Sequence, residues 1–102
     1  MRIVELDAKD WADVIDFYNA MKRALCSSPG HGSSPDAWID SMIYGGMNAL
    51  EPPYVIRITG TANCNDELKT EIVLLSNAIR EARVWRLKHY GDDVNVSFEI
   101  DT

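Results

Sequence analysis

Three short segments of the chain have the residue pattern of β-strands. Residues 2–6 alternate polar and apolar side chains, residues 54–59 form a β-branched run, and residues 94–100 alternate again. Alternation is typical of a strand with one buried face, whereas a continuous apolar run is typical of a strand buried inside a sheet. Pro52 and Pro53 favour an extended entry into the second segment. We therefore expect residues 54–59 to form the central strand.

A first helix is predicted over residues 11–25. Asp10 is its expected N-cap, and Asp13 follows three residues later in the manner of a capping box. A 3.6-residue period marks the side that should face the core. The members of that side are Trp11, Val14, Ile15, Tyr18, Met21 and Leu25. A structural helix that packs on the core accounts for this pattern.

A loop rich in Ser, Gly and Pro over residues 27–34 separates this helix from a second, shorter one. Ser34 is the predicted N-cap, and Pro35 occupies the first helical position, where its missing N–H costs nothing. The helix should end near Tyr44, before the glycine pair 45–46.

The longest predicted helix covers residues 67–87 and has a regular apolar stripe. The stripe consists of Leu68, Ile72, Leu75, Ile79 and Ala82. The order of elements is therefore β-α-α-β-α-β. Helical crossovers between successive strands favour parallel pairing with right-handed connections. We expect one α/β domain over residues 1–102, a small three-stranded parallel sheet with packed helices.

The charge of the chain limits the kinds of partner it can bind. Ten Lys and Arg residues against sixteen Asp and Glu give a formal net charge of −6. Nucleic-acid binding depends on neutralising phosphates, so this balance argues against a direct nucleic-acid ligand. The same charge favours a basic protein partner.

Neither a cofactor nor a metal is indicated by the residue pattern. Cys26 and Cys64 lie far apart and have no zinc-site spacing, so we expect free thiols in a reducing compartment. The first residues contain no apolar signal segment, and no run reaches the roughly 18–20 apolar residues that cross a bilayer. The expectation is a cytoplasmic protein, off the membrane and monomeric when free.

The acidic residues are most conspicuous in the second predicted helix, because residues 24–56 contain no Lys or Arg. At 100° per residue, Asp36, Asp40 and Tyr44 share one side of the helix. The opposite arc consists of Trp38, Ile39 and Met42. Two carboxylates at i, i+4 repel by a few tenths of a kcal/mol, which suggests a role other than helix stability. A solvated helix face remains the alternative.

A further acid, Glu81, lies on the third helix away from the core stripe. Its i±3 and i±4 neighbours include no base, so no ion pair within the helix claims it. Leu74 and Trp85 share its side of the helix. This side is either an exposed interface with apolar character or a second buried face.

His31 is the one candidate for a catalytic base, because it follows Cys26 and precedes Asp36. Proximity in sequence is weak support for a catalytic set, since such groups usually come from distant segments. We expect His31 to be an exposed loop residue or a partner contact.

Several segments together resemble the barstar family of bacterial ribonuclease inhibitors. Residues 31–40 read HGSSPDAWID, where the family has tyrosine-glycine before a helix with Asp-Ala-Leu-Trp-Asp. Residues 79–83 read IREAR, where the family has Phe-Arg-Glu-Ala-Lys. The first strand, the first helix and the proline-initiated second strand follow in the family's order.

The resemblance implies an inhibitor whose second helix and preceding loop enter the active site of a basic ribonuclease or toxin domain. Asp40 would be the principal mimic of substrate phosphate, with Asp36 one turn earlier and Glu81 from the last helix. Gly32 would be the loop glycine at which the two backbones approach. Ile39, His31 and Tyr44 complete the expected contact surface.

The aromatic residues depart from the family pattern. Gly30 and His31 stand where the family has an aromatic pair, and Ile39 stands where it has the helix tryptophan, with Trp38 one position earlier. Since the carboxylates match and the aromatic residues do not, we expect the same mode of blockade on a different cognate nuclease.

Three functions remain open from the sequence. The leading one is an intracellular ribonuclease inhibitor of the toxin-immunity type, which is not an enzyme. The alternative is a barstar-like binding or regulatory module whose partner is not a nuclease. The third is a small hydrolase that uses His31.

Overall fold

The computed structural model describes residues 1–28, 30–45 and 48–101. Three strands form one parallel sheet, namely β1 (Arg2–Asp7), β2 (Tyr54–Thr59) and β3 (Val96–Ile100). The strand order is β1-β2-β3, so residues 54–59 occupy the centre as expected. The α/β architecture and the order β-α-α-β-α-β are thereby confirmed.

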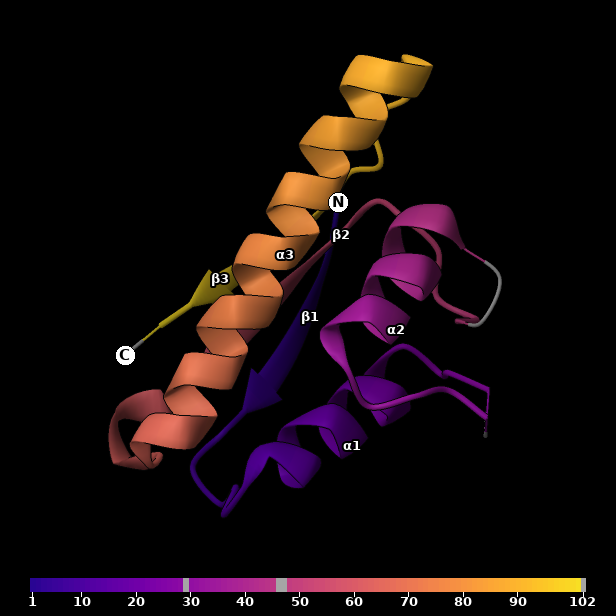
Figure 1. Cartoon of the computed structure of the whole chain (residues 1–102). Helices are drawn as coiled ribbons and strands as arrows, with labels where there is room; N and C mark the ends of the chain where they lie inside the picture. The colour runs from indigo at the N-terminus through magenta and orange to yellow at the C-terminus, as the bar shows by residue number, and fades with distance from the viewer. Residues whose placement is uncertain (29, 46–47, 102) are drawn as a thin grey trace.

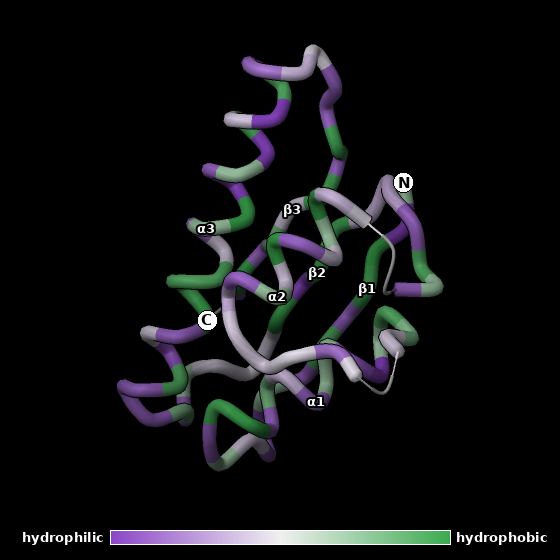
Figure 2. The backbone as a smooth tube through the Cα atoms, turned by 45° about the vertical axis from the view of Figure 1, so that its right-hand side comes forward, coloured by the Kyte–Doolittle hydropathy of each residue, from purple (hydrophilic) through white to green (hydrophobic). Residues whose placement is uncertain are grey.

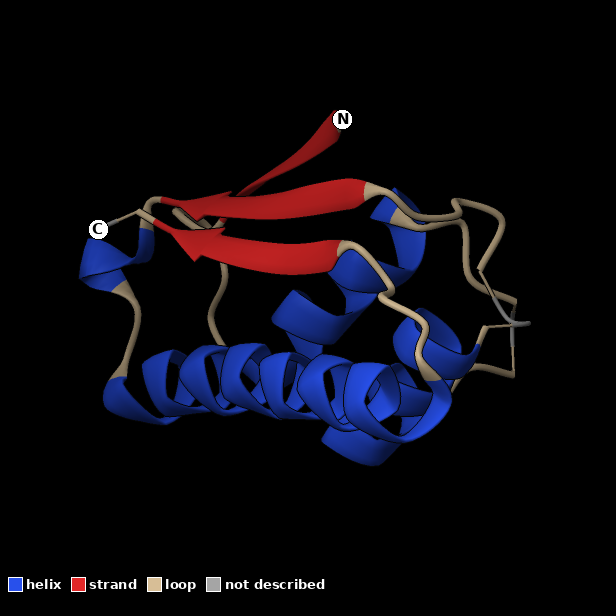
Figure 3. Ribbon diagram, turned by 90° about the horizontal axis from the view of Figure 1, so that it is seen from above, coloured by secondary structure: helices blue, strands red, loops and turns tan. Residues whose placement is uncertain are grey.

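The helices cover a single face of the sheet (Figure 3). They are α1 (Val14–Ala24), α2 (Pro35–Ile39), the π-helical turn η1 (Asp40–Tyr44) and α3 (Asp66–Tyr90), with a short 3-10 turn η2 (Thr61–Asn63) before α3. Among the described residues, no helix is both long and apolar enough to cross a membrane.

The two faces of the central strand β2 differ: one packs on the core and the other carries charged side chains. Alternate β2 side chains, Tyr54, Ile56 and Ile58, are buried under the helices. On the opposite face, the guanidinium of Arg57 lies 3.5 Å from the carboxylate of Glu5 and 3.6 Å from that of Glu99. One face of the sheet is therefore packed and the other is solvated, which confines the core to the space between sheet and helices.

The start of α1 differs from the sequence prediction, because Asp13 and not Asp10 is the N-cap. The Asp13 carboxylate accepts a hydrogen bond from the Asp16 N–H at 3.1 Å. Asp16 in turn accepts from the Ala12 N–H at 2.8 Å. Two aspartates at the correct spacing thus satisfy neighbouring backbone donors, and the helix begins three residues later than expected.

The buried side of α1 is also rotated from the predicted one. Ile15 is 55% exposed, whereas Phe17 is completely buried. Tyr18 and Met21 are buried as predicted. Trp11 lies ahead of the helix and contacts the Phe17 ring with centroids 5.6 Å apart. The arc containing Phe17 therefore faces the core instead of the arc containing Ile15, and Trp11 packs on Phe17 from the preceding loop.

Helix α3 runs the length of the molecule (Figure 1). Its 25 residues at about 1.5 Å each span about 37 Å, close to the longest dimension of 39 Å. The predicted stripe is buried as far as Ile79, and no residue after it in α3 is fully buried. Hydrophobic positions nevertheless recur in the final turns (Figure 2). The C-terminal part of α3 therefore presents apolar side chains to solvent.

Candidate functional site

The acidic helix predicted from the sequence is built from α2 and η1, which continue one another (Figure 1). Ser34 caps α2 as expected, its hydroxyl accepting from the Ala37 N–H at 3.3 Å, and Pro35 occupies the first turn. Asp36 and Asp40 are both exposed, while Trp38 on the opposite side is completely buried. The predicted separation of acidic and apolar sides is confirmed.

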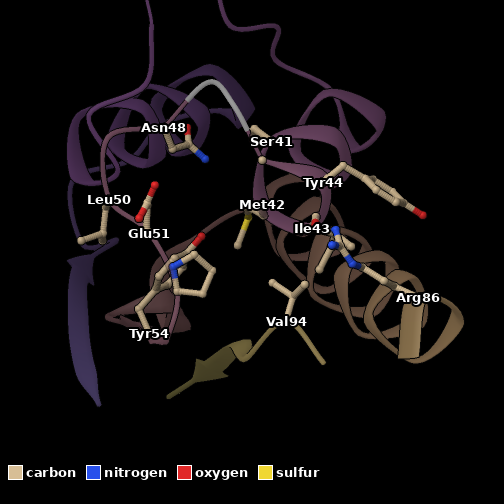
Figure 4. Close-up of a pocket in the computed structure, with 12 residues that line it drawn as sticks. Ser41, Met42, Ile43, Tyr44, Asn48, Leu50, Glu51, Tyr54, Arg86 and Val94 are labelled. Atoms are coloured by element: carbon tan, nitrogen blue, oxygen red, sulfur yellow. Dashed lines mark hydrogen bonds between the residues drawn. The ribbon is translucent and has the colours of Figure 1, made fainter. Parts of the chain in front are cut away.

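The π-helical turn holds Asp40 at its start and Tyr44 at its end. Single π-turns are rare and often occur at functional sites. The turn ends at Gly45, which has a φ of +86° that favours glycine. The Arg86 guanidinium of α3 donates to the Ile43 carbonyl oxygen and lies 5.6 Å from the centre of the Tyr44 ring (Figure 4). Arg86 thereby ties the end of η1 to α3.

His31 is 3% exposed, so the prediction of an exposed loop residue is wrong. Its ring lies against Trp38 with centroids 3.9 Å apart. Nδ1 is 2.7 Å from the Gly32 carbonyl oxygen, and Nε2 is 2.7 Å from the Ser41 hydroxyl oxygen. Burial on an aromatic surface, with both ring nitrogens hydrogen-bonded, outweighs the loop's polar composition. His31 fastens the loop to the acidic helix.

The contact between His31 and Trp38 extends into the core, because Trp38 in turn contacts a further aromatic ring. The rings of Trp38 and Tyr18 are stacked with centroids 6.4 Å apart. The Tyr18 hydroxyl donates to the Glu71 carboxylate of α3 at 2.5 Å. Burial and this carboxylate raise the pKa of Tyr18 above its ordinary range. The loop, α2, α1 and α3 are therefore linked by one continuous set of contacts.

Gly32 has a steric role within the chain itself. A Cβ atom added at this position would lie 3.1 Å from the Ala37 Cβ, closer than ordinary van der Waals contact. The absence of a side chain lets the loop pass close to the first turn of α2. That Gly32 also contacts the partner, as the family resemblance implies, stays a prediction.

A shallow hollow of about 310 Å³ lies between η1 and α3. Its lining residues are Ile39, Tyr44, Ala78, Glu81, Ala82 and Trp85. Three residues that the sequence analysis placed in the contact surface are thus brought together, although Glu81 is distant in sequence from Ile39 and Tyr44. Trp85 is 45% exposed and Leu74 46%, so their side of α3 is an exposed surface and not a second buried face.

A larger cavity of about 440 Å³ opens on another side of η1, beside the start of β2 (Figure 4). Arg86 and Tyr44 form one wall, and Asn48 and Glu51 come from the segment before β2. Of these residues, only Tyr44 belongs to the contact surface expected from the sequence. No group of three potential metal ligands is found within the described ranges.

The acids of the site are not held in ion pairs, unlike five other acids of the described chain. In the described part of the protein, ion pairs involve Asp7, Glu5, Glu99, Asp93 and Asp92. Asp36, Asp40 and Glu81 take part in no ion pair with any residue that the structure describes. These three exposed carboxylates, like Asp10 and several other acids, are not engaged in an ion pair within the described structure.

Comparison with known families agrees with this arrangement. The profile described as Barstar (barnase inhibitor) matches residues 1–99. Members of this family are inhibitors rather than enzymes. No match is found among curated proteins. Since the family profile covers nearly the whole chain, the protein belongs to the barstar family.

Proposed function

We propose that this protein inhibits a basic ribonuclease, of the toxin-immunity type, by inserting α2, η1 and the preceding loop into the nuclease active site. The observation that carries the proposal is the set of exposed carboxylates, Asp36, Asp40 and Glu81, that take part in no ion pair among the described residues. Asp40 directly follows Ile39, and Ile39 lines the same hollow as Glu81. The shared hollow, lined by residues of α2, η1 and α3, supports a contact surface that draws on all three elements.

The chemistry of a ribonuclease site suits such a surface. An enzyme that cleaves RNA must present cations to phosphate, and those cations can form charge-assisted hydrogen bonds with carboxylates instead. An acidic surface without compensating bases also attracts a basic partner over long range and speeds encounter. Asp40 is the proposed principal substitute for phosphate, and Asp36 and Glu81 are the supporting ones.

The inhibitor acts without a catalytic step of its own. His31, the candidate base, is buried, and both of its ring nitrogens are hydrogen-bonded within the chain. Such a histidine lacks the access to a substrate proton that general-base catalysis needs. His31 supports the site by holding the loop, while Gly32, Ile39 and Tyr44 are proposed to contact the partner.

Co-expression with a candidate nuclease tests this function. The candidate is a basic ribonuclease or toxin domain encoded beside the gene for this protein, and the readouts are rescue of growth and co-purification. We expect the wild-type chain to rescue growth, Asp40→Ala to fail and Asp36→Ala to rescue partially. Asp10→Ala removes an exposed acid outside the site and should rescue fully. Equal rescue by Asp40→Ala and the wild type would contradict the site assignment.

A second candidate is a regulatory binding module whose partner is not a nuclease. It is favoured by one observation: Trp38 is buried in the core, and Ile39 stands where the family has its helix tryptophan. A partner lacking nuclease activity, bound with little dependence on salt, would support this alternative over the inhibitor.

A further inference from the structure

The C-terminal turns of α3 carry an exposed aromatic cluster, Trp85, His89 and Tyr90. The imidazole of His89 stacks on the Trp85 indole with centroids 4.1 Å apart and an interplanar angle of 14°. Tyr90 meets the indole edge-on with centroids 5.6 Å apart. His89 Nδ1 is also 2.9 Å from the Trp85 carbonyl oxygen. These contacts hold the indole in place while it remains 45% exposed.

The indole belongs to the hollow between η1 and α3. Ile39, Ala78 and Ala82 are its aliphatic lining, and Tyr44 and Trp85 are its two aromatic residues. Among the described residues that line it, Glu81 is the only charged one. The hollow, with a volume of about 310 Å³, therefore combines aliphatic surface, aromatic surface and one carboxylate.

We propose that this hollow receives an arginine side chain of the partner nuclease, with Trp85 as the aromatic anchor that sets specificity. The inference rests on the proposed function, because it assigns the occupant to the same basic partner. It adds a residue, Trp85, and a type of contact that the acids alone do not provide. Trp85 lies one turn beyond Glu81 on α3, and both side chains line the hollow.

Arginine fits the three kinds of surface better than other side chains do. Its methylene stem can lie on the aliphatic lining, its planar guanidinium can stack on an aromatic ring, and its N–H groups can donate to the Glu81 carboxylate. Lysine offers a compact charge that stacks less well, and an acidic side chain would be repelled. The same pairing already occurs inside the chain, where the Arg86 guanidinium lies over Tyr44.

Trp85 also provides an exposed tryptophan in a chain whose second helix lacks one at the position where the family has it. Trp38 is completely buried and Ile39 precedes Asp40, so α2 presents no tryptophan to the partner. Trp85 supplies an exposed tryptophan from α3 beside Ile39 instead. Tryptophan is enriched at the residues that dominate binding energy in interfaces. The exchange changes which nuclease is recognised while the acidic blockade stays the same.

Affinity for the nuclease that the wild-type chain inhibits tests the inference. Trp85→Ala should raise Kd by roughly 30-fold, while Trp85→Phe, which keeps a ring, should raise it by less than about 5-fold. Val84→Ala, on the adjacent and 59% exposed position, is the matched control and should change Kd by less than about 2-fold. Thermal unfolding of each variant verifies that the fold is retained.

A double-mutant cycle identifies the occupant. Arginine, lysine and large apolar residues of the nuclease surface are changed to alanine one at a time, and one arginine change should show coupling with Trp85→Ala and none with Val84→Ala. Coupling to a lysine or an apolar residue instead would overturn the assignment of arginine. Unchanged Kd in Trp85→Ala, with a large loss in Asp40→Ala, would refute this inference alone. Unchanged Kd in both variants would refute the proposed function as well.

Discussion

The acidic segment α2–η1 and the C-terminal part of α3 differ in whether their charged side chains form ion pairs. In the first, Asp36 and Asp40 are exposed and take part in none of the ion pairs of the described residues. In the second, Arg83 pairs with Asp93 at 2.7 Å and Arg86 with Asp92 at 3.4 Å. The two regions are adjacent, because Arg86 reaches the Ile43 carbonyl oxygen.

The paired bases organise the structure around the site. Arg83 forms two hydrogen bonds with the Asp93 carboxylate and a third with the Val96 carbonyl oxygen, which links α3 to β3. The hydrogen bonds raise the pKa of Arg83 and lower that of Asp93. A charge engaged inside the chain in this way is less available to a partner. Net charge alone hides this difference: pairing engages five of the sixteen acids, and it leaves Asp36, Asp40 and Glu81 among the unpaired ones.

The strongest test of the comparison is removal of an unpaired acid. Asp40→Ala should weaken binding to the cognate nuclease by roughly 100-fold, because a cation buried in the interface would lose its partner. The free energy of unfolding should stay nearly unchanged, since the carboxylate forms no ion pair in the described structure. Titration calorimetry and chemical denaturation measure the two effects. A large loss of stability with intact affinity would reverse the assigned roles.

His31 separates support of the site from contact with the partner. His31→Ala removes a ring stacked on Trp38 and a hydrogen bond with the Ser41 hydroxyl, so it should lower the free energy of unfolding by about 1–3 kcal/mol. Asp40→Ala should not do so. Urea denaturation of both variants provides the comparison. Unchanged stability of His31→Ala, together with weaker binding, would show that His31 is a direct contact after all.

Salt concentration should affect the two regions unequally. Raising the ionic strength from about 0.05 to 0.5 M screens exposed charges and should slow association with the nuclease by roughly 10-fold. Unfolding should respond much less, because surface ion pairs such as that between Arg83 and Asp93 contribute little to stability. Stopped-flow binding and denaturation at the same salt concentrations test this. Association that is insensitive to salt would argue against steering by unpaired acids.

The smallest effect is expected at the paired acid Asp93. Its pKa is lowered in the folded state by the hydrogen bonds from Arg83. The pair therefore stabilises the fold above the ordinary aspartate pKa of about 4, and this contribution disappears as the pH falls through the lowered pKa. Asp93→Asn should remove that part of the acid dependence of unfolding and leave binding unchanged. Weaker binding by this variant would contradict the view that paired acids take no part in contact with the partner.

The local pattern predicted the elements correctly where one signal dominated. The β-branched run 54–59 is the central strand, and the third-helix stripe is buried from Leu68 to Ile79. The prediction was wrong where two local solutions competed. Asp10 and Asp13 could each cap α1, and the arcs of Ile15 and Phe17 could each face the core. In the structure Asp13 is the cap and Phe17 is buried with Trp11 packed against its ring, a contact that helical periodicity does not encode.

The sequence by itself determined the order of the elements, the parallel sheet and the exposed, acidic side of the second helix. Those features follow from short-range periodicity, capping residues and connection lengths. Only the tertiary structure decided that His31 is buried on Trp38 and that Glu81 and Trp85 share a hollow with Ile39 and Tyr44. The first arrangement depends on how the loop packs on α2 and η1, and the second on how α3 packs beside them. Contacts between segments far apart in the chain are set by the packing of the whole core, which local spacing does not record.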